Sequence, residues 1–362
     1  MEALCSTAGC TPTVGCPAGE VPGADALGGS AAAAPAEKIH DHPCYSEAAH
    51  HRYARLHVPV APACNLRCNY CNRKYDCTNE SRPGVVSEVL EPEEAVRKAL
   101  AVATAIPELT VVGIAGPGDA LANPGRTFAT LARLRELAPD LRLCLSTNGL
   151  ELPQHVEALV ANGVEHVTVT VNAVDPEIGA RIHPWVRPLG QRRRRGVLGA
   201  ARLLENQLAG IEALAARGVL VKVNSVAIPE VNHHHLMEVA RTVRARGACL
   251  HNIMPLIANP EHGTPFGLAG HREPTPAEML GLRAACAGDL PEMSHCQQCR
   301  ADAVGRLGED QREAFTREKI EALGLSTEAL AERREAARRA YWQQETVGAP
   351  AADEALASGG AP

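Results

Sequence analysis

Aromatic residues, long apolar runs and an excess of positive charge are scarce or missing in this 362-residue sequence. Aromatics make up 3% of the residues whereas hydrophobic residues make up 45%, so the core must be built from Val, Leu, Ile and Ala. No apolar run approaches the roughly 20 residues of a membrane-spanning helix. The formal net charge of −6 excludes the broad basic surface with which proteins bind nucleic acid or anionic membranes.

The sequence also begins without the basic start and apolar block of a secretory signal. We therefore expect a cytoplasmic protein, in which cysteines stay reduced. Thirteen cysteines are many for such a chain. Their number favours thiols that bind metal over thiols that form disulfides.

Strand-like and helical stretches alternate along most of the chain. Strands are expected at 54–60, 109–115, 141–147, 165–172, 219–226 and 249–256. Helices are expected at 91–106, 126–138, 151–162, 196–217, 232–246 and 276–287. Six βα units in series predict an α/β fold with a parallel sheet.

The two ends of the chain differ in composition from this region. Residues 1–36, with Cys5, Cys10 and Cys16, and residues 348–362 are rich in Ala, Gly and Pro, and we predict that both ends are disordered. Between them we expect two parts, a barrel domain with an N-terminal extension over 37–290 and a C-terminal segment over 291–347. The C-terminal segment combines a cysteine motif with a charged helical stretch near 309–345.

The alternation within the strands distinguishes between parallel-sheet folds. In 165–172, Val167 and Val169 share one face with Val171, whereas His166 and Thr168 lie on the other. Three further strands alternate in the same way. A doubly wound sheet would be apolar on both faces, and a complete barrel would fill its lumen with branched aliphatics. The pattern therefore predicts an open, partial barrel whose polar face lines a cavity.

Cys64, Cys68 and Cys71 form a C-x3-C-x2-C run directly after the first strand. Soft thiolate ligands on one short loop select an iron–sulfur cluster. Because a fully ligated 4Fe–4S cluster takes four ligands, three leave one iron open for chemistry. A fourth ligand from elsewhere and a structural zinc loop remain alternatives.

With Tyr70 before its last cysteine, this loop resembles the signature of the radical S-adenosylmethionine (SAM) superfamily, whose members have a partial (βα)6 barrel. The resemblance implies a 4Fe–4S cluster whose open iron binds the amino and carboxylate groups of SAM and whose electron cleaves the sulfonium to give a 5′-deoxyadenosyl radical. It also implies SAM contacts from the strand ends and from the Gly-rich segment after the second strand. The candidates are Tyr70, Gly116, Gly118, Thr147, Asn148, Asn172, Asn224 and Ile228.

Other cysteines and histidines flank the barrel strands and supply candidate ligands for further metal. These are His42, Cys44, Cys144, Cys296 and Cys299. The alternation within its strand places Cys144 on the polar face, although a small residue there could also serve only to fill space in the core. His57 and Glu80 are candidate non-thiolate ligands or proton-transfer groups, and Cys77 is either a ligand or a bystander. Arg192 to Arg195 form a basic stretch that is either a solvated turn or a contact for an acidic partner.

Seven motifs in order over about 40–305 resemble the NifB family of nitrogenase cofactor maturases. They are His42-Pro-Cys44, Arg55-x-His57, Cys64-x3-Cys68-x-Tyr-Cys71, Glu80-Ser-Arg-Pro-Gly-Val85, Ala115-Gly-Pro-Gly-Asp119, Ser146-Thr-Asn-Gly149 and Cys296-x2-Cys-Arg-x-Asp302. The resemblance implies a lyase or transferase that fuses two further 4Fe–4S clusters, a SAM-derived carbide and an added sulfur into NifB-co (8Fe-9S-C). The auxiliary residues would then hold the two substrate clusters.

By the same resemblance, the partners would be a cluster donor, an electron donor and a carrier that accepts NifB-co, and this would be the short form without a NifX-like domain. Two alternatives remain open. One is a different radical SAM maturase with auxiliary clusters, and the other is a non-catalytic iron–sulfur scaffold, which would need no open iron site.

Overall fold

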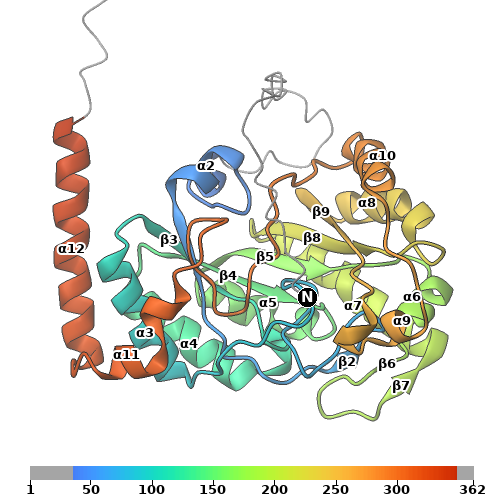
Figure 1. Cartoon of the computed structure of the whole chain (residues 1–362), viewed down its shortest axis with the longest axis horizontal. Coiled ribbons are helices and arrows are strands. Elements are labelled where there is room, and N and C mark those ends of the chain that lie inside the picture. The colour runs from blue at the N-terminus through green and yellow to red at the C-terminus, as the bar shows by residue number, and fades with distance from the viewer. Residues whose placement is uncertain (1–35, 349–362) are drawn as a thin grey trace, which may run out of the picture. The chain divides into compact units, whose positions relative to one another are not determined.

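Parallel strands joined by helices form the centre of the computed structural model, which describes residues 36–348 (Figure 1). The main strands are β1 (Ala54–His57), β3 (Leu109–Ile114), β4 (Arg142–Thr147), β5 (Val164–Thr170), β8 (Leu220–Ala227) and β9 (Leu250–Pro255). The helices between and after them are α3 (Pro92–Ala105), α4 (Pro124–Leu137), α5 (Leu152–Ala161), α7 (Gly196–Ala215), α8 (Leu236–Ala245) and α10 (Pro276–Ala287). The six predicted βα units are therefore confirmed. The structure places Ala36 and Gly348 in helices, and the rest of the two ends predicted to be disordered, including Cys5, Cys10 and Cys16, lies outside the described residues.

The sheet stays open at both sides. Its strand order is β10-β1-β3-β4-β5-β8-β9, in which β10 (Val304–Gly305) pairs antiparallel with β1 and the other neighbours are parallel. Because β10 and β9 are the edges and do not pair with each other, the sheet is a partial barrel. This confirms the predicted fold class.

Proline and polar caps determine where several helices begin. Proline occupies one of the first two positions of α3, α4, α5 and α10, where its missing N–H costs nothing. Glu91 and Glu94 form a capping box at the start of α3, and Thr275 and Glu278 form one at the start of α10. These local signals determine the residue at which each helix begins after the strand that precedes it.

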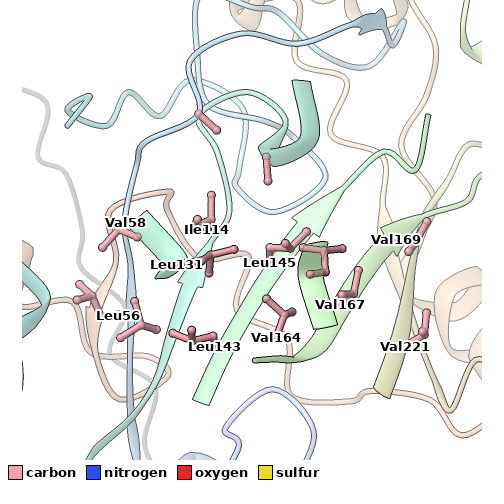
Figure 2. Packing of buried hydrophobic residues seen from close by; sticks show 14 of the residues in the cluster. Leu56, Val58, Ile114, Leu131, Leu143, Leu145, Val164, Val167, Val169 and Val221 are labelled. Atoms are coloured by element: carbon pink, nitrogen blue, oxygen red, sulfur yellow. The ribbon is translucent and has the colours of Figure 1, made fainter. Parts of the chain in front are cut away.

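The helix-facing side of the sheet carries the predicted apolar core. Figure 2 shows Leu56 of β1 and Val58 just after it, Leu143 and Leu145 of β4 and Val167 of β5 in this layer with neighbours from β3, α4 and β8. All five side chains are buried. The residues between them in the strands face the opposite side, so the period-two pattern separates an aliphatic layer from a polar lumen.

Several elements differ from the sequence-based expectation. The stretch between β5 and α7 contains α6 (Pro176–Ile182) and two short strands, β6 (Trp185–Val186) and β7 (Arg194–Arg195), which form a second sheet with β2 (Leu66–Arg67). The predicted helical stretch at 309–345 is divided into a 3-10 turn, α11 (Arg317–Glu321) and α12 (Thr327–Gly348). Gly324, with φ +63°, lies in the break between these two helices.

The remaining short elements lie at the N-terminal end and before α10. They are α1 (Ala36–Ile39), α2 (Glu47–Arg52) and α9 (Pro265–Leu268). Within residues 36–348, no helix combines the length and the apolar character that crossing a membrane requires.

Candidate active site

Two adjoining cavities occupy the polar side of the sheet. The first, which we term the loop cavity, has an empty volume of about 510 Å³ and is lined by the Cys64–Cys71 loop. The second, the lumen cavity, has an empty volume of about 540 Å³ and is lined by the polar face of the strands. Asn79, Glu80 and Ser146 line both, so a thin polar wall divides the two cavities.

All three cysteines of the predicted cluster loop line the loop cavity. Cys68 and Cys71 are each 7% exposed, and Cys71 N–H donates to the carbonyl of Cys68 at 3.2 Å. Burial raises the pKa of the Cys64 thiol to about 12 and raises that of Cys68 as well. Without metal these thiols are therefore protonated at neutral pH, and an iron ion that binds them displaces the protons.

Asp119 connects the loops that surround the cysteines. Its carboxylate accepts hydrogen bonds from the N–H of Asn148 at 2.5 Å and from the hydroxyl of Thr147 at 3.1 Å. The Asn148 amide in turn donates to Asn65 Oδ1 at 2.8 Å and lies 4.0 Å from the Cys64 sulfur. This chain of contacts positions Thr147 and Asn148, both predicted SAM contacts, on the cavity wall.

Gly118 brings the turn after β3 against the segment that leads into the cysteine loop. Its N–H donates to the carbonyl of Ala61 at 2.5 Å. A Cβ at this position would clash with the carbonyl oxygens of Ala61 and Ala63, so the close approach requires glycine. Gly118 lines the loop cavity as predicted, whereas Gly116 does not.

Three other predicted SAM contacts do not line either cavity. The Tyr70 hydroxyl is fully buried, donates to Asn79 Oδ1 at 2.7 Å and accepts from the Asn172 amide at 2.7 Å. Asn172 also accepts from the N–H of Val226 at 2.8 Å, and Ile228 is fully buried. In this structure these residues support the cavity walls from behind, and their contact with SAM stays a prediction.

The lumen cavity brings together all five predicted auxiliary ligands. They are His42, Cys44, Cys144, Cys296 and Cys299. His57 and Asn224 line the same cavity, as the parity of their strands predicted. Residues about 250 positions apart in sequence thus meet in one space, although nothing in their local spacing connects them.

A single row across the sheet holds several of these side chains. His57 of β1, Gly113 of β3, Cys144 of β4 and His166 of β5 are successive partners in register. A Cβ on Gly113 would lie 2.7 Å from the Cys144 sulfur, so the glycine makes room for the thiol. A glycine inside a strand pattern is a sequence signal for such a close approach, and it was missed.

His57 and His42, two of the three histidines that line the lumen, are held as neutral rings. Burial lowers the pKa of His57 to about 4, and its Nδ1 donates to the carbonyl of Arg300 at 2.9 Å, which leaves Nε2 with a free lone pair. Burial also lowers the pKa of His42. His42 Nε2 is buried and has no hydrogen-bond partner among the described residues. Because such an orphaned nitrogen is costly, a ligand in the lumen would satisfy it.

The C-terminal cysteines line the lumen beside β9 and β1. Asn252 of β9 donates to the Cys296 sulfur at 3.3 Å, and the Arg55 guanidinium donates to the Cys299 sulfur at 3.2 Å. Each thiol therefore meets a polar donor from the sheet. Donors of this kind stabilise the negative charge that a metal-bound thiolate carries.

Glu80 lies in the wall between the cavities. Its Oε1 accepts from the Asn224 amide at 2.9 Å, and burial raises the pKa of its carboxyl above the ordinary value. A carboxyl with a raised pKa can exchange protons nearer to neutral pH than an exposed one. This placement is compatible with either of the roles predicted for Glu80.

Lys222 was not predicted as a site residue. It is 5% exposed on β8, it lines the lumen, and its Nζ contacts the Met293 sulfur at 3.9 Å. Burial alone would lower its pKa, but Cys44, Glu80 and the other nearby acidic groups raise it above the ordinary value, so the ammonium stays charged. A charged residue at a lumen-facing position of a strand was the available sequence signal.

The donor atoms surround the two spaces without converging on a point. Among residues 36–348 no three His, Cys, Asp or Glu side chains are grouped closely enough to hold one metal ion. A multi-iron cluster takes its ligands at separate corner irons, so the donor chemistry and the spread of the residues fit clusters. Cys77, left open in the sequence, lines the loop cavity beside the three predicted ligands.

The sequence profile of the Radical SAM superfamily matches residues 58–243, which include the cysteine loop and the strands β3, β4, β5 and β8. The chain therefore belongs to the radical SAM superfamily. Members of this superfamily use a 4Fe–4S cluster and SAM, so the coarse cofactor prediction is confirmed.

The particular relatives agree with the motifs. The chain is 59% identical over 306 residues to the FeMo cofactor biosynthesis protein NifB of Herbaspirillum seropedicae, which covers 84% of this chain and 57% of that protein. It is 58% identical over 307 residues to NifB of Azotobacter vinelandii, and this match covers 85% of this chain and 61% of that protein. The resemblance to the NifB family is thus confirmed, and the chain spans about three fifths of the length of these relatives. Among solved structures, methylornithine synthase (PylB) matches at 15% identity with a TM-score of 0.42, covering 83% of this chain and 89% of that one.

Replacement of Gly118 by Ala should damage the loop cavity specifically. The added Cβ would push the Ala61–Ala63 backbone away, and overpacking of this kind costs about 1–3 kcal/mol. We expect a lower midpoint of chemical unfolding and less iron bound by the cysteine loop after anaerobic reconstitution. Gly125→Ala is the matched control, because no atom lies within 4 Å of its added Cβ. Equal iron content in the two variants would contradict this role of Gly118.

Proposed function

We propose that the protein is a radical SAM maturase that builds NifB-co (8Fe-9S-C), the precursor of the nitrogenase FeMo-cofactor. It would do so by joining two 4Fe–4S clusters with a carbide from the SAM methyl group and one added sulfur. The observation that carries the proposal is the pair of adjoining cavities, in which a three-cysteine loop stands beside a second space lined by five further ligand candidates. The NifB proteins that the chain resembles are named for FeMo cofactor biosynthesis.

Cys64, Cys68 and Cys71 would hold the resident cluster, and that cluster when bound supplies the electron that cleaves SAM. The chain's own contribution is to shape the space beside the loop. Asp119 holds the loop after β4 in place through Asn148. The Arg73 guanidinium, which lines the loop cavity, donates to the carbonyls of Pro117 and Pro62 and would supply a fixed positive charge for the SAM carboxylate.

The two substrate clusters would occupy the lumen cavity. The thiols of this cavity come from three parts of the chain, namely the N-terminal extension, β4 and the C-terminal segment. Iron–sulfur clusters with thiolate ligands are anionic, and the buried ammonium of Lys222 supplies a compensating charge inside the lumen. Glu80, in the shared wall, would take up protons released as the transferred methyl group loses its hydrogens.

The proposal extends to three kinds of partner. A protein that donates 4Fe–4S clusters would supply the substrates, an electron donor would reduce the resident cluster, and a carrier would accept NifB-co. These partners follow from the chemistry of the proposed reaction, since substrates and product are all oxygen-sensitive metal clusters that need protein hosts.

Anaerobic reconstitution followed by iron analysis and SAM turnover tests the proposal directly. We expect roughly twelve irons per chain, four for each of three clusters, and two SAM products, 5′-deoxyadenosine and S-adenosylhomocysteine. The first product reports the radical step and the second reports methyl transfer. Auxiliary iron with 5′-deoxyadenosine alone would point to a different radical SAM maturase, and intact SAM would point to a scaffold.

Cys144→Ala tests whether the lumen thiol binds iron. We expect the variant to lose part of the auxiliary iron while the Cys64 loop keeps its own cluster and its cleavage of SAM. Cys286→Ala is the control, because Cys286 is fully buried in the helix-packed core. If Cys144→Ala retains all of its auxiliary iron, the thiol is core filler.

Lys222→Met tests the buried charge without leaving a cavity. A methionine of similar length removes the ammonium, so the variant should fold at least as stably as the parent. We expect it to bind at least about twofold less auxiliary iron, while Lys222→Arg, which keeps the charge, should retain more. Full auxiliary iron in Lys222→Met would show that the lumen needs no cation.

A further inference from the structure

An exposed basic hairpin lies beside the cysteine loop and has no role in the proposed chemistry. It consists of β6, β7 and the turn between them, and every residue from Leu189 to Leu198 is exposed. We refer to residues 185–198 as the basic hairpin. Its arginines are Arg187, Arg192, Arg193, Arg194 and Arg195.

These arginines are not neutralised within the protein. In the described part of the chain, no carboxylate lies within ion-pair distance of any of the five, and Arg193 instead stacks over the Trp185 ring at 4.1 Å. Helix α7 starts at Gly196 without an acidic residue in its first turn, so the positive end of its dipole adds to the patch. A chain with a net charge of −6 thus concentrates positive charge at one exposed place.

Exposed apolar side chains accompany the arginines. Leu189, Val197 and Leu198 are 40%, 47% and 78% exposed, and they are three of the seven large hydrophobic residues exposed among the described residues. Apolar side chains and arginines together are the composition of protein-binding surfaces.

Backbone pairing joins this surface to the cysteine loop. Strand β2 lies between Cys64 and Cys68 and pairs with β6, which in turn pairs with β7. On either side of β2, Arg187 N–H donates to the Asn65 carbonyl at 2.7 Å, and Asn69 N–H donates to the Ile182 carbonyl at 2.9 Å. Because neighbouring strands lie about 4.8 Å apart, β7 is roughly 10 Å from the loop that would hold the resident cluster.

We propose that the basic hairpin docks an acidic one-electron carrier protein that reduces the cluster of the Cys64 loop. This inference rests on the proposed cluster at that loop. In the step, the reduced carrier loses one electron and the oxidised 4Fe–4S cluster gains it, and no bond forms or breaks. A protein is favoured over nucleic acid because the exposed side chains beside the arginines are aliphatic, and because the hairpin's Trp185 is already covered by Arg193.

The test compares two electron sources on the reconstituted full-length protein. The hairpin variant is Arg192→Gln, Arg194→Gln and Arg195→Gln, which leaves the Arg193–Trp185 contact intact. The probe is a reduced bacterial ferredoxin that carries two 4Fe–4S clusters. We expect its reduction of the Cys64-loop cluster, measured by absorbance, to be slower by about tenfold or more in the hairpin variant at low salt. With dithionite, which needs no docking surface, the rate should not change.

A matched control removes the same charge elsewhere. The triple change Arg241→Gln, Arg246→Gln and Arg333→Gln affects exposed arginines outside the hairpin and should leave both rates unchanged. Calorimetric titration of the oxidised ferredoxin provides a readout that does not depend on activity, and its dissociation constant should rise by about tenfold or more in the hairpin variant alone.

Three results would overturn the inference. They are an unchanged rate with ferredoxin, an equal loss of rate with dithionite, and binding of a short DNA duplex as tight as that of ferredoxin. The iron count tests the proposed function separately, since a protein with only the Cys64-loop cluster would still show the dependence on the hairpin.

Discussion

The backbone contact between the segment before Cys64 and the turn after β3 is the constraint on which the site depends. Gly118 donates to Ala61 at 2.5 Å and Asp119 donates to Ala63 at 2.8 Å. Loops that leave neighbouring parallel strands emerge at the same edge of a sheet, but nothing in the strands forces them into contact. The glycine permits that contact, and the carboxylate next to it then reaches the loop after β4. Three loops thereby form one wall, and the cysteines keep their positions relative to the strands.

The barrel and the lumen could be predicted because each rests on a repeating local pattern. Alternation at period two, as in Val167 and Thr168, reports which face of a strand meets the helices, and it needs no knowledge of the partner strand. The same parity placed His57, Cys144 and Asn224 in the lumen, where the structure has them. The family resemblance then related the cysteines at the two ends of the chain, which parity alone could not bring together.

Other features depend on contacts between segments that no local pattern connects. Two-residue strands such as β2 and β6 are too short to show a period, so the second sheet was not predicted. The hydrogen bond from the Asn172 amide to the Tyr70 hydroxyl was not foreseen either, because side chains in irregular loops do not follow strand parity; the contact of both residues with SAM stays a prediction. Lys222 is a charged residue inside a strand pattern, and Gly113 is a glycine inside another. Whether such a residue lines a site depends on which side chains lie opposite it, and a single strand does not give that information.

The pairing of β10 with β1 has a consequence for the life of the protein in the cell. The segment that carries Cys296 and Cys299 is synthesised after all the parallel strands of the sheet, and its cysteines reach the lumen only when β10 pairs with β1. Domains begin to fold as the chain emerges, N-terminal part first, so the strands with His57 and Cys144 can form before the lumen is covered. On the proposed function, the substrate clusters would then be bound only after this segment has docked. In the folded protein, local opening of this two-residue edge strand would cost far less than unfolding the barrel.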